Sequence, residues 1–220
     1  MMRAISLFSG CGGFDEGADR CGVRVQIAVE YNQQACSTFA LNHPYTNLLN
    51  QDIREIDFTY YRGQIDLVFG GPPCQPFSRA ANQSRGKNDN RDMVPEFLRC
   101  VEEVRPKYFL MENVAALAGR RHKNYFEDVL SRMGEMGYAV SYRVLDASKF
   151  GSAQKRKRLI VIGRLGEEPI NIPPYSLSKR PALEDLLDGI YPFMCAPGPG
   201  PDVVYAKNPV VHRSVGGSLL

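Results

Sequence analysis

The sequence predicts an α/β protein with a doubly wound, mostly parallel sheet and an antiparallel hairpin at one edge. Three observations support this prediction. Short apolar runs of strand type alternate with helix-like segments over about the first 165 residues. A glycine-rich turn, SGCGG, joins the first run to the first helical segment. The last two runs follow each other without room for a crossover helix.

The expected strands and helices follow in chain order. Runs rich in apolar and β-branched residues predict strands at AISLF, VQIAVE, IDLVFG and KYFLMEN, with a weaker strand near NLLNQDI. Helical spacing of apolar residues predicts helices over Phe14 to Cys21, Gln33 to Leu41, Met93 to Val104 and Tyr125 to Met136. The runs YAVSYRVLDAS and RLIVIGRL are expected to form the antiparallel pair.

Residues 1–166 are expected to form one domain, and residues 167–220 a region of different character. Nine of the 15 prolines fall in this second region, where only ALEDLLDG has a helical pattern. The composition predicts a linker or the start of another domain.

The overall composition sets few limits on function. The chain has 220 residues and a formal net charge of +3, so any nucleic-acid surface must be local. Neither a signal peptide nor an apolar run of bilayer length is visible, which predicts a cytoplasmic protein without a membrane partner. The six cysteines show no metal-ligand spacing, so reduced thiols and no metal site are expected.

The glycine-rich stretch LFSGCGGFDEG predicts a ligand site at the carboxyl edge of the sheet. Glu30, at the end of the second expected strand, is placed to accept hydrogen bonds from ribose hydroxyls. Asp15 stands where a dinucleotide fingerprint needs its third glycine, which disfavours a nicotinamide oxidoreductase. A nucleoside without phosphates fits better, with Asp52 accepting from an adenine amino group. The alternative is that the glycines make only a tight turn.

One cysteine differs from the other five in its surroundings. In FGGPPCQPFS, Pro72, Pro73 and Pro76 restrict the backbone on both sides of Cys74. The loop leaves the carboxyl end of the expected strand IDLVFG, at the same edge as the glycine turn. A thiolate held in this way is a nucleophile with a fixed approach. A packed structural cysteine, the alternative, needs no such frame.

Two further segments bring polar side chains to this edge. KYFLMEN delivers Glu112 and Asn113, and a carboxyl group in an apolar pocket has a raised pKa and can donate to a ring nitrogen. A helix cap or a salt-bridged acid is the alternative for Glu112. GSAQKRKRLIVIG places Gln154, Arg156 and Arg158 on one face of the last strand, toward the site. Its lysines lie on the other face, toward DNA phosphates or solvent.

Together, these blocks resemble the cytosine-C5 DNA methyltransferases, which use S-adenosylmethionine. The resemblance extends over roughly residues 3–165, through LFSGCGGFDEG, VEYN, NQDI, GGPPCQPFS, NRDMVPEFLRCVEEVRPKYFLMENV and ASKFGSAQKRKRLIVIG. It implies the Rossmann-like class I methyltransferase fold, a role in a restriction-modification system and, in a bacterium, association with the nucleoid.

The resemblance also assigns roles to residues. It implies that Cys74 is the nucleophile, that Glu112 binds the cytosine N3 edge, and that the flipped base lies near Arg156 and Arg158. It implies an S-adenosylmethionine site lined by Phe8, Gly10, Cys11, Gly13, Glu30, Tyr31, Asp52, Ile53 and Pro73, without a metal. It implies that double-stranded DNA is contacted by Gln75, Ser78, Arg79, Arg91, Asn113 and Gln154.

Complete members of the family carry a target-recognition region and two further motifs after the last block matched here. Residues 167–220 are accordingly expected to be a linker or the truncated start of that region. Three explanations stay open: one subunit of a split enzyme completed by a second polypeptide, a truncated chain, and a degenerate protein. An RNA cytosine-C5 methyltransferase of the same fold and a cofactor-binding regulatory protein without catalysis also stay open.

Overall fold

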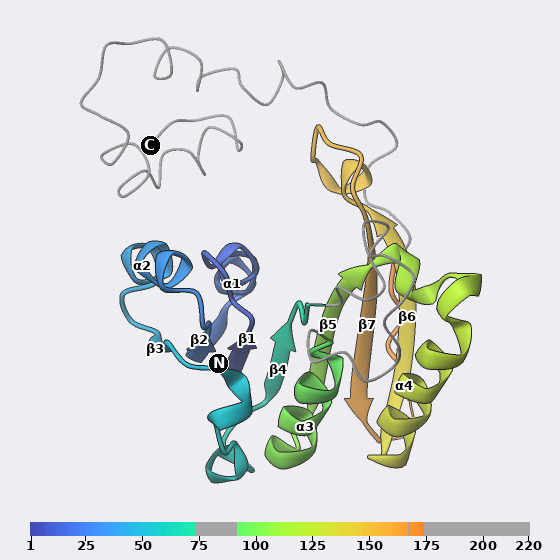
Figure 1. Ribbon diagram of the computed structural model, residues 1–220, viewed down its shortest axis with the longest axis horizontal. Coiled ribbons are helices and arrows are strands. Elements are labelled where there is room, and N and C mark those ends of the chain that lie inside the picture. The colour runs from blue at the N-terminus through green and yellow to red at the C-terminus, as the bar shows by residue number, and fades with distance from the viewer. Residues whose placement is uncertain (74–91, 167, 174–220) are drawn as a thin grey trace. The chain divides into compact units, whose positions relative to one another are not determined.

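A seven-stranded sheet organises the part of the chain that the computed structural model describes, residues 1–73, 92–166 and 168–173. Its strand order is β3-β2-β1-β4-β5-β7-β6 (Figure 1). The strands are β1 (Met2–Leu7), β2 (Val23–Val29), β3 (Asn47–Leu49), β4 (Leu67–Gly70), β5 (Tyr108–Val114), β6 (Tyr138–Asp146) and β7 (Lys157–Leu165).

The strand directions agree with the predicted topology. Strands β1 to β5 pair in parallel, so their carboxyl ends meet at one edge. Strand β7 runs antiparallel to β5. Two backbone hydrogen bonds close the β6–β7 hairpin, from Gly166 N–H to Gly137 O (3.1 Å) and from Ala147 N–H to Arg156 O (2.9 Å). The prediction of a doubly wound, mostly parallel sheet with an antiparallel hairpin at its edge is confirmed.

Helices cover both faces of the sheet because successive residues of each strand point to opposite sides. The α-helices of the described residues are α1 (Gly13–Arg20), α2 (Gln33–Asn42), α3 (Val94–Val104) and α4 (Lys123–Glu135), each within two residues of its predicted bounds. Short 3-10 turns are η1 (Ile53–Glu55), η2 (Thr59–Tyr61), η4 (Ala115–Ala118), η5 (Arg120–His122) and η6 (Ala147–Phe150).

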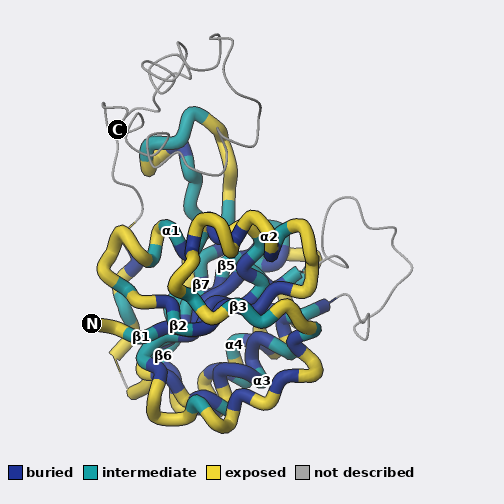
Figure 2. Tube along the Cα trace, turned by 90° about the vertical axis from the view of Figure 1, so that its left-hand side faces the viewer, coloured by how far each residue is buried: buried dark blue, intermediate teal, exposed yellow. Residues whose placement is uncertain are grey.

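The main core lies between the sheet and helices α3 and α4. Ile5 and Leu7 of β1 belong to it, while Ala4, which points to the opposite face, belongs to a smaller cluster with Phe14 of α1. Buried residues are concentrated in the strands and on the inner sides of α3 and α4 (Figure 2). Both faces of the strands are therefore packed, and the free carboxyl edge is where a site can form.

Strand β3 is shorter than the sequence pattern predicts. Beyond Leu49, the Asn50 side chain donates to the carbonyl oxygens of Glu30 (3.0 Å) and Tyr31 (3.1 Å). Asp52 then caps turn η1 by accepting a hydrogen bond from the Arg54 N–H (3.0 Å). These side-chain contacts turn the chain out of the sheet.

The chain divides into two units, Met1–Val144 with Lys157–Pro173, and Leu145–Arg156 with Pro174–Leu220. The predicted boundary between residues 166 and 167 stays a prediction, because most of the second region lies outside the described residues. Among the described helices, none has the length and apolar character needed to span a bilayer.

Candidate active site

A pocket of about 420 Å³ lies at the carboxyl edge of the parallel strands. It is lined by the segments that follow β1, β2, β3 and β4, together with the residue before α3. The lining residues are Phe8, Val29, Glu30, Tyr31, Asn32, Gln51, Asp52, Ile53, Arg54, Gly71, Pro73 and Met93. Of the predicted cofactor residues, the pocket brings together Phe8, Glu30, Tyr31, Asp52, Ile53 and Pro73, while Gly10, Cys11 and Gly13 do not line it.

Glu30 provides a buried carboxylate at the wall of the pocket, with 8% of the residue exposed. Its Oε2 accepts a hydrogen bond from the Gly10 N–H (2.9 Å), and its Oε1 accepts one from the Asn32 N–H (2.8 Å). A carboxylate has about four lone-pair sites, so both oxygens can accept further hydrogen bonds. Fixed backbone donors thus hold an acceptor for hydroxyl groups, while the contact with ribose itself stays a prediction.

Asp52 and Ile53 form a second part of the wall, with different chemistry. Hydrogen bonds from the Arg54 side chain, and then from its backbone N–H, lower the pKa of Asp52 to about 2. The Arg54 guanidinium contacts both carboxylate oxygens, at 2.9 and 2.5 Å. Ile53 is buried and apolar. An ionised acceptor therefore lies beside an apolar surface, a combination that suits an adenine ring and its amino group.

The glycine turn contributes mainly through its backbone. Gly10 has φ 57° and uses its N–H to hold Glu30. Gly12 has φ 89°, and a Cβ at that position would lie 2.5 Å from the ring of His43. The turn was interpreted either as part of a ligand site or as a tight turn only. Gly10 fits the first interpretation because it holds Glu30, and Gly12 fits the second because it permits close packing.

Asp15 is buried in the first turn of α1 and does not line the pocket. Within the described residues, neither of its carboxylate oxygens has a hydrogen-bond partner. Burial raises the pKa of Asp15 to about 6, against the opposing effects of the nearby Ser6 hydroxyl and His43. Asp15 therefore argues against a dinucleotide cofactor only because it replaces the third glycine of the fingerprint. It does not place a negative charge at the pocket wall.

The structure describes only the base of the cysteine loop. The predicted residues Cys74, Gln75, Ser78, Arg79 and Arg91 all lie outside the described residues.

Two hydrogen bonds tie the segment that leads into this loop. The buried Asn113 side chain donates to the Pro72 carbonyl oxygen (3.1 Å), and the Met93 N–H donates to the Pro73 carbonyl oxygen (3.0 Å). Asn113 thus positions the chain before Cys74, and its predicted DNA contact stays a prediction.

Glu112 and Arg158 are brought together by the antiparallel register of β5 and β7. Glu112 lies opposite Ile160, so Arg158, two residues before Ile160, points to the same face. The distance from Arg158 Nε to Glu112 Oε1 is 2.7 Å, and 27% and 29% of these side chains are exposed. Of the two environments considered for Glu112, the structure shows the salt-bridged acid and not the apolar pocket.

Glu112 also lies next to the chain that leads to Cys74. A Cβ at Gly71 would be 3.3 Å from Glu112 Oε2, which is tighter than an ordinary contact. Gly71 lines the ligand pocket as well. The acid, the pocket and the base of the cysteine loop therefore meet at one glycine.

Arg156 and Gln154 belong to the second unit, and their places are described within it alone. The Arg156 N–H donates to Asp146 Oδ1 (3.3 Å), and the Gln154 N–H donates to the Ser152 hydroxyl (3.1 Å). Their predicted roles beside the base and on DNA stay predictions.

Some residues at this edge were not singled out by the sequence. Arg54 forms an ion pair with Asp52. The only sign of this pair in the sequence was that Arg54 follows Asp52 by two residues. Arg120 and Arg121 follow β5 in turn η5 and are exposed. The basic run GRRHK could have drawn attention to them, although such runs are usually solvated surface. In the described parts of the chain, no group of three or more His, Cys, Asp or Glu residues is arranged to hold a metal.

Comparisons with known proteins involve the same segments. A family model described as C-5 cytosine-specific DNA methylase matches residues 2–193. The type II methyltransferase M.NgoPII of Neisseria gonorrhoeae is 37% identical over 185 residues, which cover 84% of this chain and 53% of that protein. M.AquIA of Picosynechococcus is 40% identical over 182 residues, covering 75% of this chain and 73% of that protein.

Two further results concern length and fold. The chain spans about half the length of the first curated relatives it matches, with 53% and 52% coverage. A mutant form of Spodoptera frugiperda DNMT2 superposes with a TM-score of 0.68 at 24% identity, covering 84% of this chain and 59% of that one. This likeness supports the fold alone.

Proposed function

The chain belongs to the C-5 cytosine-specific DNA methylases, and we propose on that basis that it forms the catalytic part of a type II DNA (cytosine-5-)-methyltransferase of a restriction-modification system. The relatives named above are type II methyltransferases. They do not favour the two alternatives, RNA methylation and a regulatory role without catalysis. Because the chain spans about half the length of the first curated relatives, the activity of the whole protein belongs to the proposal.

The pocket suits S-adenosylmethionine through the chemistry of its wall. Glu30 would accept from the ribose hydroxyls, Ile53 and Phe8 would contact the adenine ring, and Asp52 would accept from its amino group. When bound, S-adenosylmethionine supplies an activated methyl group. The buried carboxylate of Glu30, held by two backbone N–H groups, is what supports this fit.

The contact between Glu112 and Arg158 is the single observation that carries the proposed chemistry. On cytosine, N3 and O2 are neighbouring atoms of one ring edge. An acid that donates to N3 and a cation that polarises O2 must therefore be neighbours, and these side chains are 2.7 Å apart. Glu112 must be protonated to donate a hydrogen bond to N3. The Arg158 guanidinium would then leave Glu112 and contact O2 of the base.

The proposed reaction begins with the Cys74 thiolate, which adds to C6 of the base. The electron pair of the C5–C6 double bond moves toward N3 and O2, where Glu112 and Arg158 stabilise it, and C5 becomes nucleophilic. After C5 is methylated, loss of the C5 proton and expulsion of the thiolate restore the ring. Because stacked bases hide C5 and C6, the cytosine has to be flipped out of the duplex.

Binding of the DNA backbone needs positive charge at the same edge. Arg120 and Arg121 are exposed there, and no ion-pair partner is found for either among the described residues. We propose that both contact DNA phosphates.

Target recognition requires more than the described site. We infer that a further polypeptide segment supplies the target-recognition region, as the family resemblance implies. M.AquIA is matched over 73% of its length, which makes it a relative close to this chain in size. We propose that this segment lies either on a second polypeptide or on a longer form of the chain.

Expression of the gene with its genomic neighbours, in a host without cytosine methylation, tests the proposal. Bisulfite sequencing should detect 5-methylcytosine at one short recurring sequence. The variant Cys74→Ser should abolish the signal, while Cys21→Ser, at an exposed cysteine, should leave it unchanged. Absence of DNA methylation with the wild type, or its persistence in Cys74→Ser, would contradict the proposal.

A further inference from the structure

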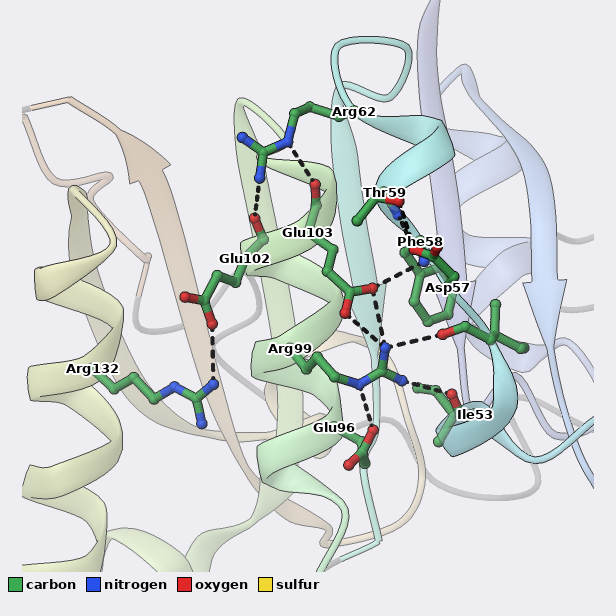
Figure 3. A network of polar contacts seen from close by, with 11 residues as sticks. Ile53, Asp57, Phe58, Thr59, Arg62, Glu96, Arg99, Glu102, Glu103 and Arg132 are labelled. Carbon is green, nitrogen blue, oxygen red and sulfur yellow. Dashed lines mark hydrogen bonds and ion pairs between the residues drawn. The ribbon is translucent and has the colours of Figure 1, made fainter.

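Arg99, on helix α3, is the centre of a polar network beside the ligand pocket (Figure 3). Its Nε donates to Glu96 Oε2 (2.8 Å), and one terminal nitrogen donates to both carboxylate oxygens of Glu103 (2.9 and 3.0 Å). The guanidinium lies 5.6 Å from the centre of the Phe58 ring. With 27% of its side chain exposed, Arg99 is more enclosed than an ordinary surface arginine.

The same guanidinium holds turn η1 at both of its ends. It donates to the Ile53 carbonyl oxygen (2.7 Å) and to the Ile56 carbonyl oxygen (3.0 Å). Figure 3 shows Arg99 reaching from α3 to Ile53. Ile53 lines the ligand pocket, whereas Arg99 does not. Arg99 therefore contacts the back of the wall whose front faces the ligand.

Two acids keep the cation in this position. Burial alone would lower the pKa of Arg99, but the hydrogen bonds that its guanidinium donates to Glu96 and Glu103 outweigh this effect, and the pKa is raised. Glu103 also accepts from the Phe58 N–H (2.9 Å), so it connects α3 to the chain that follows η1. A planar guanidinium can satisfy these acceptors together, which a single ammonium group cannot.

We propose that Arg99 is a positioning residue for the cofactor, which fixes the wall formed by Asp52 and Ile53 without touching the ligand. The proposal rests on the function proposed above, because it assigns that wall to the adenine end of S-adenosylmethionine. If turn η1 is ordered in only a fraction of the molecules, the apparent dissociation constant rises by the inverse of that fraction. Removal of Arg99 should therefore weaken cofactor binding.

Arg62, which follows turn η2, offers a matched control because it also contacts helix α3. It donates to the carbonyl oxygens of Glu102 (3.0 Å) and Glu103 (3.0 Å), near the carboxyl end of α3. Like Arg99, it is an arginine that joins α3 to a neighbouring turn through two backbone carbonyls. Unlike Arg99, it holds no residue of the pocket wall.

Calorimetry with S-adenosylhomocysteine on the full chain, below the unfolding temperature of every variant, tests the proposal. Arg99→Ala should raise the dissociation constant about tenfold, and Arg99→Lys by a smaller factor. The dissociation constant of Arg62→Ala should stay within twofold of the wild-type value, even if its melting temperature falls as much as that of Arg99→Ala. An equal rise in Arg62→Ala, or no rise in Arg99→Ala, would show that Arg99 acts only on general stability.

Hydrogen exchange tests the same claim without a ligand. The N–H groups of Glu55 and Ile56 close turn η1 by bonding to Asp52 and Ile53. They should exchange about tenfold faster in Arg99→Ala, faster by a smaller factor in Arg99→Lys, and at the wild-type rate in Arg62→Ala. Unchanged exchange in the Arg99 variants would overturn the inference. Failure of the wild type to bind S-adenosylhomocysteine would instead refute the proposed function.

Discussion

Glu30 directly follows β2 and Glu112 lies near the carboxyl end of β5, so both are at the same edge of the sheet, yet their surroundings differ. Glu30 is buried, and its carboxylate accepts hydrogen bonds from the backbone N–H groups of Gly10 and Asn32. Glu112 is partly exposed and is held by the Arg158 side chain. A backbone-held acid suits a cofactor that binds in one way, whereas an acid paired with a side chain can exchange its partner for an incoming base.

The largest expected effect separates catalysis from cofactor binding. Glu112→Ala should lower the rate of methyl transfer by about 10³-fold, because a positioned acid contributes 10²- to 10⁴-fold. The dissociation constant for S-adenosylhomocysteine should remain within twofold, since the pocket lining does not include Glu112. Single-turnover kinetics and calorimetry measure the two quantities. A loss confined to cofactor affinity would reverse the roles assigned to the two acids.

Asp15 extends the comparison to an acid without a hydrogen-bond partner in the described structure. Its folded-state pKa of about 6 lies above the ordinary value of 3.8, so its ionisation costs stability as the pH rises from about 4 to 6. Asp15→Asn resembles the protonated acid. It should raise the free energy of unfolding by up to about 3 kcal/mol at pH 7 and leave it nearly unchanged at pH 4.

Urea unfolding at the two pH values measures this difference. Glu16→Gln, in the same helical turn, is the control, since that acid is ion-paired with Arg20 near the surface. It should show no comparable gain at pH 7. A gain in Asp15→Asn that is equal at pH 4 and pH 7 would mean that charge burial is not its cause.

A smaller effect is expected at Glu30. Glu30→Ala removes the acceptor for the ribose hydroxyls and leaves two N–H groups without their partner. S-adenosylhomocysteine binding should weaken by about tenfold or more, because a hydrogen bond to a charged group contributes about 1.5–3 kcal/mol. The circular dichroism spectrum should stay that of the wild type. Unchanged affinity by calorimetry would remove Glu30 from the cofactor site.

The smallest effect concerns the DNA backbone. The double variant Arg120→Ala and Arg121→Ala should reduce the slope of log affinity against log salt by about 2, at any DNA sequence. Arg24→Ala, an exposed residue near the amino end of β2, should leave that slope unchanged. Equal slopes for the double variant and the wild type would exclude phosphate contacts from these arginines.

The sequence was sufficient where local patterns decide the structure. Alternating runs and helical spacing predicted the parallel strands, so the residues that follow them, such as Glu30, were correctly placed at one edge. Half of the residues that line the pocket, including Ile53 and Pro73, are among the cofactor residues predicted from the family motifs.

Other features depend on contacts between distant segments, which no local pattern contains. The pairing of Glu112 with Arg158 follows from the β5–β7 register, across 46 positions of the chain. The burial of Asp15 depends on how α1 packs on the sheet. The hold of Arg99 on Ile53 likewise joins a helix to a turn 46 residues away. Such contacts require the tertiary structure.

The most direct test of the proposed chemistry is covalent trapping. Duplex DNA that contains 5-fluorocytosine at the methylated sequence is incubated with the complete enzyme and S-adenosylmethionine. Fluorine replaces the proton that must leave C5, so the thiolate cannot be expelled and the adduct persists. Mass spectrometry should identify a DNA-linked peptide attached through Cys74, with no adduct in Cys74→Ser. A wild-type enzyme that methylates cytosine but forms no adduct, or forms it at another residue, would contradict the account.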